Sequence, residues 1–121
     1  MIVAGFGFRT RATVDSFQGA LAKCTTPPVT DFAVPVEKSQ HTAFQAFAHA
    51  TQTSVHLVRS DHLQLQKTPT QSAKSLALKG TGSVAEAAAL AAAGPGARLT
   101  HRRVISDDGC VTCAIAIRGP K

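Results

Sequence analysis

The sequence contains no tryptophan, no tyrosine and no long uninterrupted hydrophobic run. Proteins that bind single-stranded nucleic acid stack bases on aromatic rings set among basic residues, whereas the six phenylalanines here have the spacing of core residues. No segment approaches the roughly 18 consecutive apolar residues of a membrane-spanning helix. We therefore predict that neither nucleic acid nor a membrane is a partner.

Cysteine is scarce, with only Cys24, Cys110 and Cys113. The N-terminal residues have no basic region before their short apolar run, and two glycines interrupt that run, so we expect no signal peptide. An odd cysteine count without an export signal favours reduced thiols and a cytoplasmic protein. Cys110 and Cys113 have C-x-x-C spacing, but residues three apart in a strand point to opposite faces. A metal or redox pair there would require Cys110 to belong to a turn.

Several catalytic and cofactor motifs are also missing. Gly5 and Gly7 follow an apolar run as in a dinucleotide-binding turn, but Thr10 stands where the third glycine belongs. The sequence has no G-K-[ST] for a nucleotide phosphate and no H-E-x-x-H for zinc. The five histidines are scattered, and no nucleophile–base pair can be identified from spacing. We predict no metal and no cofactor.

The charge balance is strongly basic. Thirteen Lys and Arg against seven Asp and Glu give a formal charge of +6, with a pI near 9.8. The preferred partner should therefore be acidic: a nucleic acid, an anionic surface, or a small polycarboxylate or phosphate. The length and the 44% hydrophobic content fit one globular domain over residues 1–121.

Helical and strand patterns alternate along the chain. Strands are expected at 1–6, 31–36, 54–58, 99–105 and 111–118, and helices at 14–23, from Ser39 or His41 to 52, at 60–63 and at 84–93. Thr13 is the expected N-cap of the first helix, and Pro35 should lie near a sheet edge or a strand end. Residues 68–79 read as a long loop, either a lid or a plain connection. The pattern predicts an α/β fold: a layered domain with a mixed, mostly parallel sheet of about five strands and a C-terminal antiparallel hairpin that turns at Asp107-Asp108-Gly109.

A glycine-rich corner precedes the last helix. Gly80, Thr81 and Gly82 lead to Ser83, whose hydroxyl can accept from the first turn while Glu86 reaches back to the Ser83 N–H. Backbone without Cβ atoms next to the positive end of a helix suits an anion. The alternative is that the glycines only make a turn and Ser83 only starts the helix.

Basic residues follow the first strand and fill the fourth. Arg9 and Arg11 come directly after the first strand, where parallel strands present their ligand sites. His101, Arg102 and Arg103 form a second basic run, although alternation would place the two arginines on opposite faces. We expect only some of these side chains to converge.

Three segments together resemble a known family. They are Gly5-Phe6-Gly7-Phe8-Arg9, the block Gly80-Thr81-Gly82-Ser83-Val84-Ala85-Glu86-Ala87-Ala88, and the strand Ala114-Ile115-Ala116-Ile117-Arg118. In this order they resemble the CobE family, which is similar to the C-terminal domain of CbiG, in cobalamin (vitamin B12) biosynthesis. The resemblance covers nearly the whole chain.

The resemblance implies a corrin-ring intermediate as ligand, with other cobalamin-pathway enzymes as further partners. Precorrins carry acetate and propionate carboxylates, which suit a basic rim, a helix N-terminus and an apolar floor. The implied ligand-binding residues are Gly5, Gly7, Arg9, Arg11, Gly80, Thr81, Gly82 and Ser83.

Two functions remain open on this basis. We favour a non-catalytic carrier or accessory protein, because no nucleophile or base stands beside the expected anion site. The alternative, implied by CbiG, is a hydrolase that opens a precorrin lactone and releases acetaldehyde, with Glu86 as the weak catalytic candidate. Our hypothesis for Glu86 is a helix cap.

Overall fold

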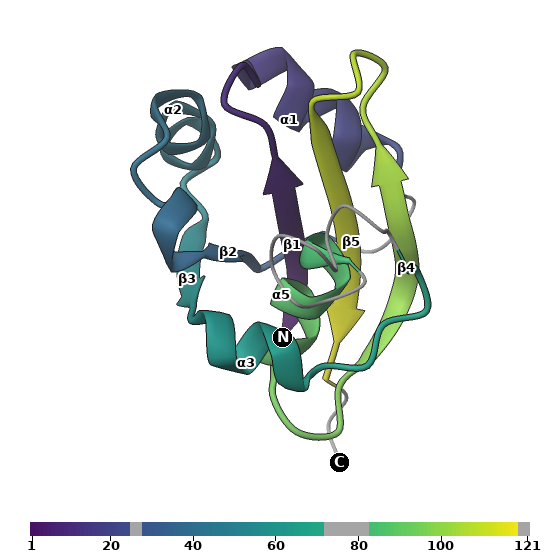
Figure 1. The fold of residues 1–121 in the computed structure, drawn as a ribbon. Helices are drawn as coiled ribbons and strands as arrows, with labels where there is room; N and C mark the ends of the chain where they lie inside the picture. The colour runs from purple at the N-terminus through teal and green to yellow at the C-terminus, as the bar shows by residue number, and fades with distance from the viewer. Residues whose placement is uncertain (25–27, 72–82, 119–121) are drawn as a thin grey trace.

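The computed structural model describes residues 1–24, 28–71 and 83–118. These residues form a five-stranded sheet with helices on both faces (Figure 1). In chain order the elements are β1 (Ile2–Phe8), α1 (Val14–Ala22), β2 (Asp31–Pro35), the 3₁₀ turn η1 (Val36–Lys38), α2 (Thr42–Thr51), β3 (Ser54–Val58), α3 (Ser60–Leu65), α5 (Val84–Ala93), β4 (Arg98–Ile105) and β5 (Val111–Ile117). None of the described helices is long and apolar enough to cross a membrane.

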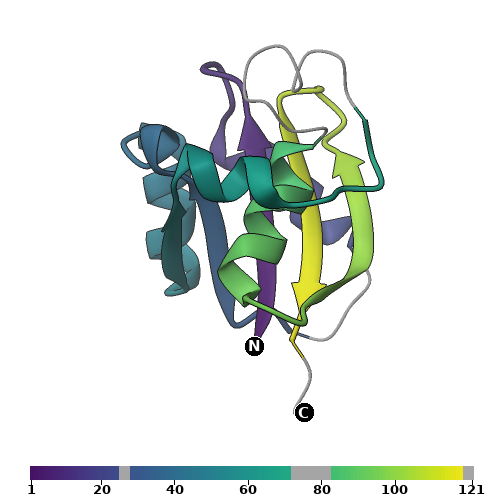
Figure 2. The same cartoon turned by 60° about the horizontal axis from the view of Figure 1, so that its bottom comes forward.

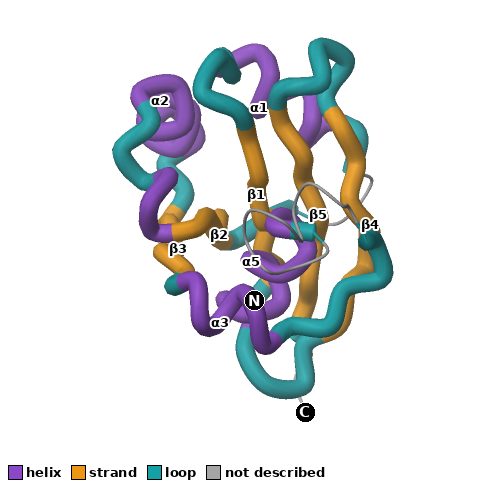
Figure 3. Tube along the Cα trace, viewed as in Figure 1, coloured by secondary structure: helices purple, strands orange, loops and turns teal. Residues whose placement is uncertain are grey.

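The strand order is β3-β2-β1-β5-β4. β1, β2 and β3 are parallel, while β5 runs antiparallel to both of its neighbours, β1 and β4. Four of these five strands therefore point the same way, and β5 lies between two of them (Figure 3). The predicted α/β class, with a mixed sheet and a C-terminal hairpin, is confirmed.

Helices cover both faces of the sheet. α1 and α2 lie on one face, and α5 with the short α3 lies on the other, as the turned view in Figure 2 shows. All six phenylalanines pack in the core between the sheet and the helices α1 and α2, and Phe6 makes edge contacts to several other rings. Three of them, Phe17, Phe44 and Phe47, belong to the helices themselves. The prediction that these residues form a core is confirmed.

The opposite face is built from small side chains. α5 buries alanines against β1, and a Cβ atom on Gly5 would overlap the carbonyl oxygen of Ala85 and lie 2.6 Å from the backbone nitrogen of Ala89. Only glycine allows the helix to approach this strand so closely. Gly5 is therefore covered by α5, and β1 continues past the predicted end at residue 6 to Phe8.

Most predicted element boundaries agree with the structure. β3 and α5 have the predicted bounds, Pro35 is the last residue of β2, and α1 begins after Thr13 in a full capping box with Ser16. α3 is longer than the single turn expected and extends to Leu65. The expected loop or lid at 68–79 falls mainly outside the described residues.

Candidate functional site

The candidate site lies where β1 ends. Going out from β1, the chain turns through residues 9–13 into α1 on one face, while the N-terminus of α5 reaches the same edge from the other face. A Cβ on Gly7 would lie 3.4 Å from the Cβ of Val84, which places the start of α5 against the end of β1. We call residues 9–13 with Ser83 and Val84 the β1 rim. Open α/β sheets bind ligands at such a switch between faces.

The loop of the β1 rim carries the two predicted arginines. Arg9 and Arg11 are both exposed. The Arg9 backbone N–H donates to the Cys110 carbonyl at 2.9 Å, and the Ala12 N–H donates to the Arg9 carbonyl at 3.1 Å. The loop is thus held by backbone contacts while both guanidinium side chains stand at the surface.

His41 supplies a further support for this loop. Its Nδ1 accepts the Phe44 N–H at 3.3 Å and so caps α2, which leaves Nε2 to donate to the Thr10 carbonyl at 2.7 Å. Its ring also lies 5.0 Å from that of Phe8. The sequence indicated His41 only as a helix start, because its contact with Thr10 spans two elements.

The N-terminus of α5 is capped as predicted, but its cap is hidden. The Ser83 hydroxyl accepts the Glu86 N–H at 3.2 Å, and the Ser83 residue is fully buried. Ser83 therefore caps the helix from inside the protein, and its side chain is not at the surface. Gly80, Thr81 and Gly82, the other predicted residues of this corner, lie outside the described residues.

Glu86 bridges three segments from inside the protein. It is 0% exposed, and its carboxylate accepts the Thr70 N–H at 3.0 Å, the Thr70 hydroxyl at 2.8 Å and the Arg103 N–H at 2.9 Å. We expected the Glu86 carboxylate to cap its own helix. Instead, it links α5 to β4 and to the segment after α3. The reason is that Thr70 and Arg103, distant in sequence, present donors to it.

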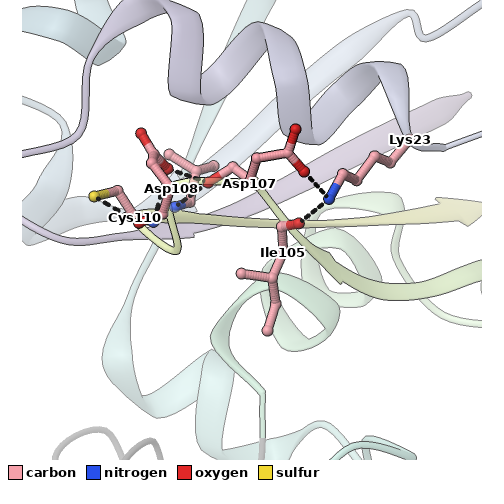
Figure 4. A network of polar contacts seen from close by, with 7 residues as sticks. Lys23, Ile105, Asp107, Asp108 and Cys110 are labelled. Carbon is pink, nitrogen blue, oxygen red and sulfur yellow. Dashed lines mark hydrogen bonds and ion pairs between the residues drawn. The ribbon is translucent and has the colours of Figure 1, made fainter.

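The N-terminus of α1 already holds a carboxylate (Figure 4). Asp108, in the β4–β5 turn, accepts from the Ser16 hydroxyl in the first turn of α1, and its other oxygen accepts from the Ser106 hydroxyl at 2.6 Å and the Cys110 N–H at 3.0 Å. The hydrogen bonds from Ser106 and Ser16 lower the pKa of Asp108 from its ordinary value of 3.8 to about 2. Asp108 therefore ties the β4–β5 turn to the first turn of α1.

A second contact joins the same turn to the end of α1 (Figure 4). Lys23 Nζ lies 2.8 Å from a carboxylate oxygen of Asp107 and donates to the Ile105 carbonyl at 2.8 Å. The Asp107 side chain is 97% exposed, so this ion pair is screened by solvent and contributes little to stability.

The basic run in β4 does not follow simple alternation. The pairing of β4 with β5 shifts register twice, between Leu99 and His101 and between His101 and Val104. Arg102 and Arg103 lie in the second irregularity, where the Arg103 N–H turns to Glu86. The pairing around this pair is therefore irregular, and the expected placement of the two arginines on opposite faces stays a prediction.

No metal site is present within residues 1–24, 28–71 and 83–118, where no three His, Cys, Asp or Glu side chains gather closely enough. Cys110 lies in the turn before β5, and its thiol is 3.7 Å from the Asp108 carbonyl oxygen. Cys110 therefore belongs to a turn and not to a strand, which is the condition that the sequence analysis set for a pair with Cys113. Cys113 is buried within β5.

Comparison with known proteins places these features in a family. A profile of the family described as Cobalamin synthesis G C-terminus matches residues 2–116. The chain belongs to this family. Its involvement in cobalamin biosynthesis, expected from the sequence, is thereby supported. No match was found among curated proteins.

Solved structures agree with the assignment to the cobalamin synthesis G C-terminal family. CobE, a protein from the cobalamin biosynthetic pathway, is 25% identical, with a TM-score of 0.83 over 96% of this chain and 89% of CobE. Cobalamin biosynthesis protein chiG from Agrobacterium tumefaciens is 32% identical, with a TM-score of 0.76 over 99% of this chain and all of that one. A putative cobalamin biosynthesis protein G homolog from Sulfolobus solfataricus shares the fold, with 21% identity and a TM-score of 0.69 over 98% of this chain and 37% of its own.

Proposed function

We propose that this protein binds a polycarboxylate corrin-ring intermediate at the β1 rim and serves cobalamin biosynthesis as a carrier or accessory protein. The family supports the class of ligand, because the corrin intermediates of this pathway are macrocycles fringed with carboxylates. The observation that carries the proposal is the placement of Arg9 and Arg11, both exposed on a short loop whose backbone is held by Cys110 and His41. A held loop loses little entropy when its arginines bind carboxylates.

Most of the electrostatic attraction for the carboxylates of the ligand should come from the two arginines. The carboxylate of Asp108 lies beside the first turn of α1, and the acidic residue Glu86 lies in the first turn of α5. The dipole of α5 is thus partly offset. Binding should therefore depend on Arg9 and Arg11 more than on a helix N-terminus, and it should weaken with salt.

The surroundings of Glu86 favour binding over hydrolysis. A general base must come within hydrogen-bond reach of the proton that it removes. Glu86 is fully buried and its carboxylate already accepts three hydrogen bonds, so no substrate proton reaches it in this arrangement. The arrangement fits the structural role better than the catalytic one.

The test is a titration followed by the visible absorbance of the corrin. The probes are cobyrinic acid, whose carboxylates are free, and cobinamide, whose side chains are amidated. Removing both guanidinium groups in the Arg9→Ala/Arg11→Ala variant should weaken binding of cobyrinic acid about tenfold, equivalent to about 1.4 kcal/mol. Cobinamide should bind the wild type more weakly than cobyrinic acid does.

The matched control removes the same charge elsewhere. Arg98 and Arg102 are exposed on β4, so the Arg98→Ala/Arg102→Ala variant has the same net charge as the first variant. Equal weakening in both variants would show attraction to overall charge and contradict a site at the β1 rim. In a separate incubation with a corrin lactone, consumption of the lactone by the protein would contradict the carrier role.

A further inference from the structure

Two thiols that are distant in sequence meet on the α1 face of the sheet. Cys24 follows the last turn of α1, where its N–H donates to the Leu21 carbonyl at 3.0 Å, and Cys113 lies in the middle of β5. Both pack in the same apolar cluster under α1 and α2. The side chains of Cys24 and Cys113 are joined by a hydrogen bond. The partner of Cys113 is thus Cys24, although the sequence spacing pointed to Cys110.

The two sulfurs differ in access to solvent. Cys24 is partly exposed and lines a cavity of about 320 Å³ together with Leu21, Phe32 and Thr51. Cys113 is 0% exposed and lies behind it. A small reagent therefore reaches Cys24 first, and Cys113 is in place for a second step. Cys110, in the β4–β5 turn, is buried and its thiol faces the Asp108 carbonyl.

The surroundings also make the two thiols chemically unequal. The hydrogen bond from the Cys113 thiol lowers the pKa of Cys24 from its ordinary 9.0 to about 7, with a further contribution from the charge of His101 on β4. Burial and the neighbouring Cys24 raise the pKa of Cys113. Near neutral pH, Cys24 therefore exists in substantial part as the thiolate, which is the nucleophilic form.

We propose that Cys24 and Cys113 form a redox-active pair that a low-molecular-weight disulfide oxidises to an intramolecular disulfide. The Cys24 thiolate attacks one sulfur of the small disulfide, whose S–S bond breaks and releases one thiolate. Cys113 then attacks the Cys24 sulfur, passes its proton to the departing thiolate and displaces the second small thiol. Two electrons pass from the two cysteines to the small disulfide.

The product would be a covalent link between the end of α1 and the centre of the sheet. Both residues belong to the core cluster that α1 seals, so the link restrains α1 against β5. It closes a long stretch of chain, and restraint of the unfolded chain in this way stabilises the folded form. The oxidised protein should therefore melt at a higher temperature than the reduced protein.

The experiment treats the native chain with oxidised glutathione and follows its intact mass and its peptide map. The wild type should lose two hydrogens and yield one cross-linked peptide pair containing Cys24 and Cys113. The Cys113→Ala variant should stop at one glutathione on Cys24, because no second thiol displaces it. Cys110→Ala is the matched control and should behave as the wild type does.

A pH series gives a second readout that does not depend on formation of the disulfide. The rate of alkylation of Cys24 by iodoacetamide should rise with a midpoint near pH 7 in the wild type, and the midpoint should move to higher pH in Cys113→Ala, where the donor is lost. A glutathione adduct on Cys110, a Cys24–Cys110 bond, or three free thiols in the native wild type would overturn the proposal.

Discussion

At the scale of single residues, two glycines in this chain have opposite roles. Gly5 lies under α5, where the helix backbone occupies the space that a side chain would need. Gly19 lies in α1, and a Cβ there would meet nothing within 4 Å. The absence of a side chain is thus required for packing at one position and is only a local cost to helix formation at the other.

The two positions give a paired prediction. Gly5→Ala should lower the free energy of unfolding by roughly 3 kcal/mol, because α5 must move away from β1. Gly19→Ala should raise it by about 1 kcal/mol, because alanine favours the helix and adds no contact that must be relieved. Urea unfolding followed by circular dichroism measures both. Destabilisation by both substitutions to the same extent would contradict the close approach of α5 to β1.

At the scale of elements, the β4–β5 turn locks α1 in position. Asp108 accepts hydrogen bonds from the first turn of α1 and from its own turn, so it closes the hairpin and fixes the helix start together. Asp107, next to it, has an exposed side chain and pairs only with Lys23 among the described contacts. Of the two neighbouring carboxylates, Asp108 thus holds both the hairpin and the start of α1, whereas Asp107 makes only an exposed ion pair.

Acid should weaken the hydrogen bonds that the Asp108 carboxylate accepts. The pKa of Asp108 is lowered in the folded protein, so its contribution to stability is present above pH 3.8 and is lost as the pH falls through about 2. Thermal unfolding between pH 5 and pH 2 should therefore show a weaker loss of stability on acidification for Asp108→Asn than for the wild type. Some slope should remain, because hydrogen bonds from Thr30 and His56 also lower the pKa of Asp31.

Asp107→Asn is the control for this measurement. It removes the same charge one position away and should leave the acid dependence of the wild type in place. Identical curves for Asp108→Asn and the wild type would show that the turn does not depend on the ionised carboxylate.

At the scale of the whole molecule, Glu86 connects α5, β4 and the segment that follows α3. In Glu86→Gln one carboxylate oxygen is replaced by an NH₂ group, which would face an N–H that still needs an acceptor. Leaving such a buried donor unpaired should cost about 1–3 kcal/mol of stability. Urea unfolding measures the loss, and hydrogen exchange should be faster at the Thr70 and Arg103 amides in the variant.

The same variant tests the assignment of Glu86 as a structural residue. Binding of cobyrinic acid at a protein concentration corrected for unfolding should be unchanged, because the carboxylate is buried. A fully stable Glu86→Gln protein that lost turnover of a corrin lactone would reverse this assignment and favour the hydrolase.

Local signals in the sequence predicted much of the fold. The Ser83 cap and the stop at Gly94-Pro95-Gly96 bounded α5, and the β-branched run between polar residues bounded β3. These signals depend on residues that are close in sequence, so they can be recognised without knowing which segments pack together. The exposed positions of Arg9 and Arg11 at the end of β1 also followed from simple chain order.

Contacts between distant segments could not be predicted. The bonds of Asp108 to Ser16 and of Glu86 to Thr70 depend on the strand order, which no local pattern contains. The register shifts between β4 and β5 likewise depend on the pairing partner, which the sequence of β4 alone does not contain.

The place of β5 in the sheet has a consequence for how the protein is made. β1 leaves the ribosome before β5 does, yet one of its two edges pairs with residues 111–117. Until β5 has been made, that edge and the apolar side chains along it lack this partner, which favours association with other chains. The sheet can close only after β5 has emerged, so the nascent chain should benefit from a chaperone during this interval.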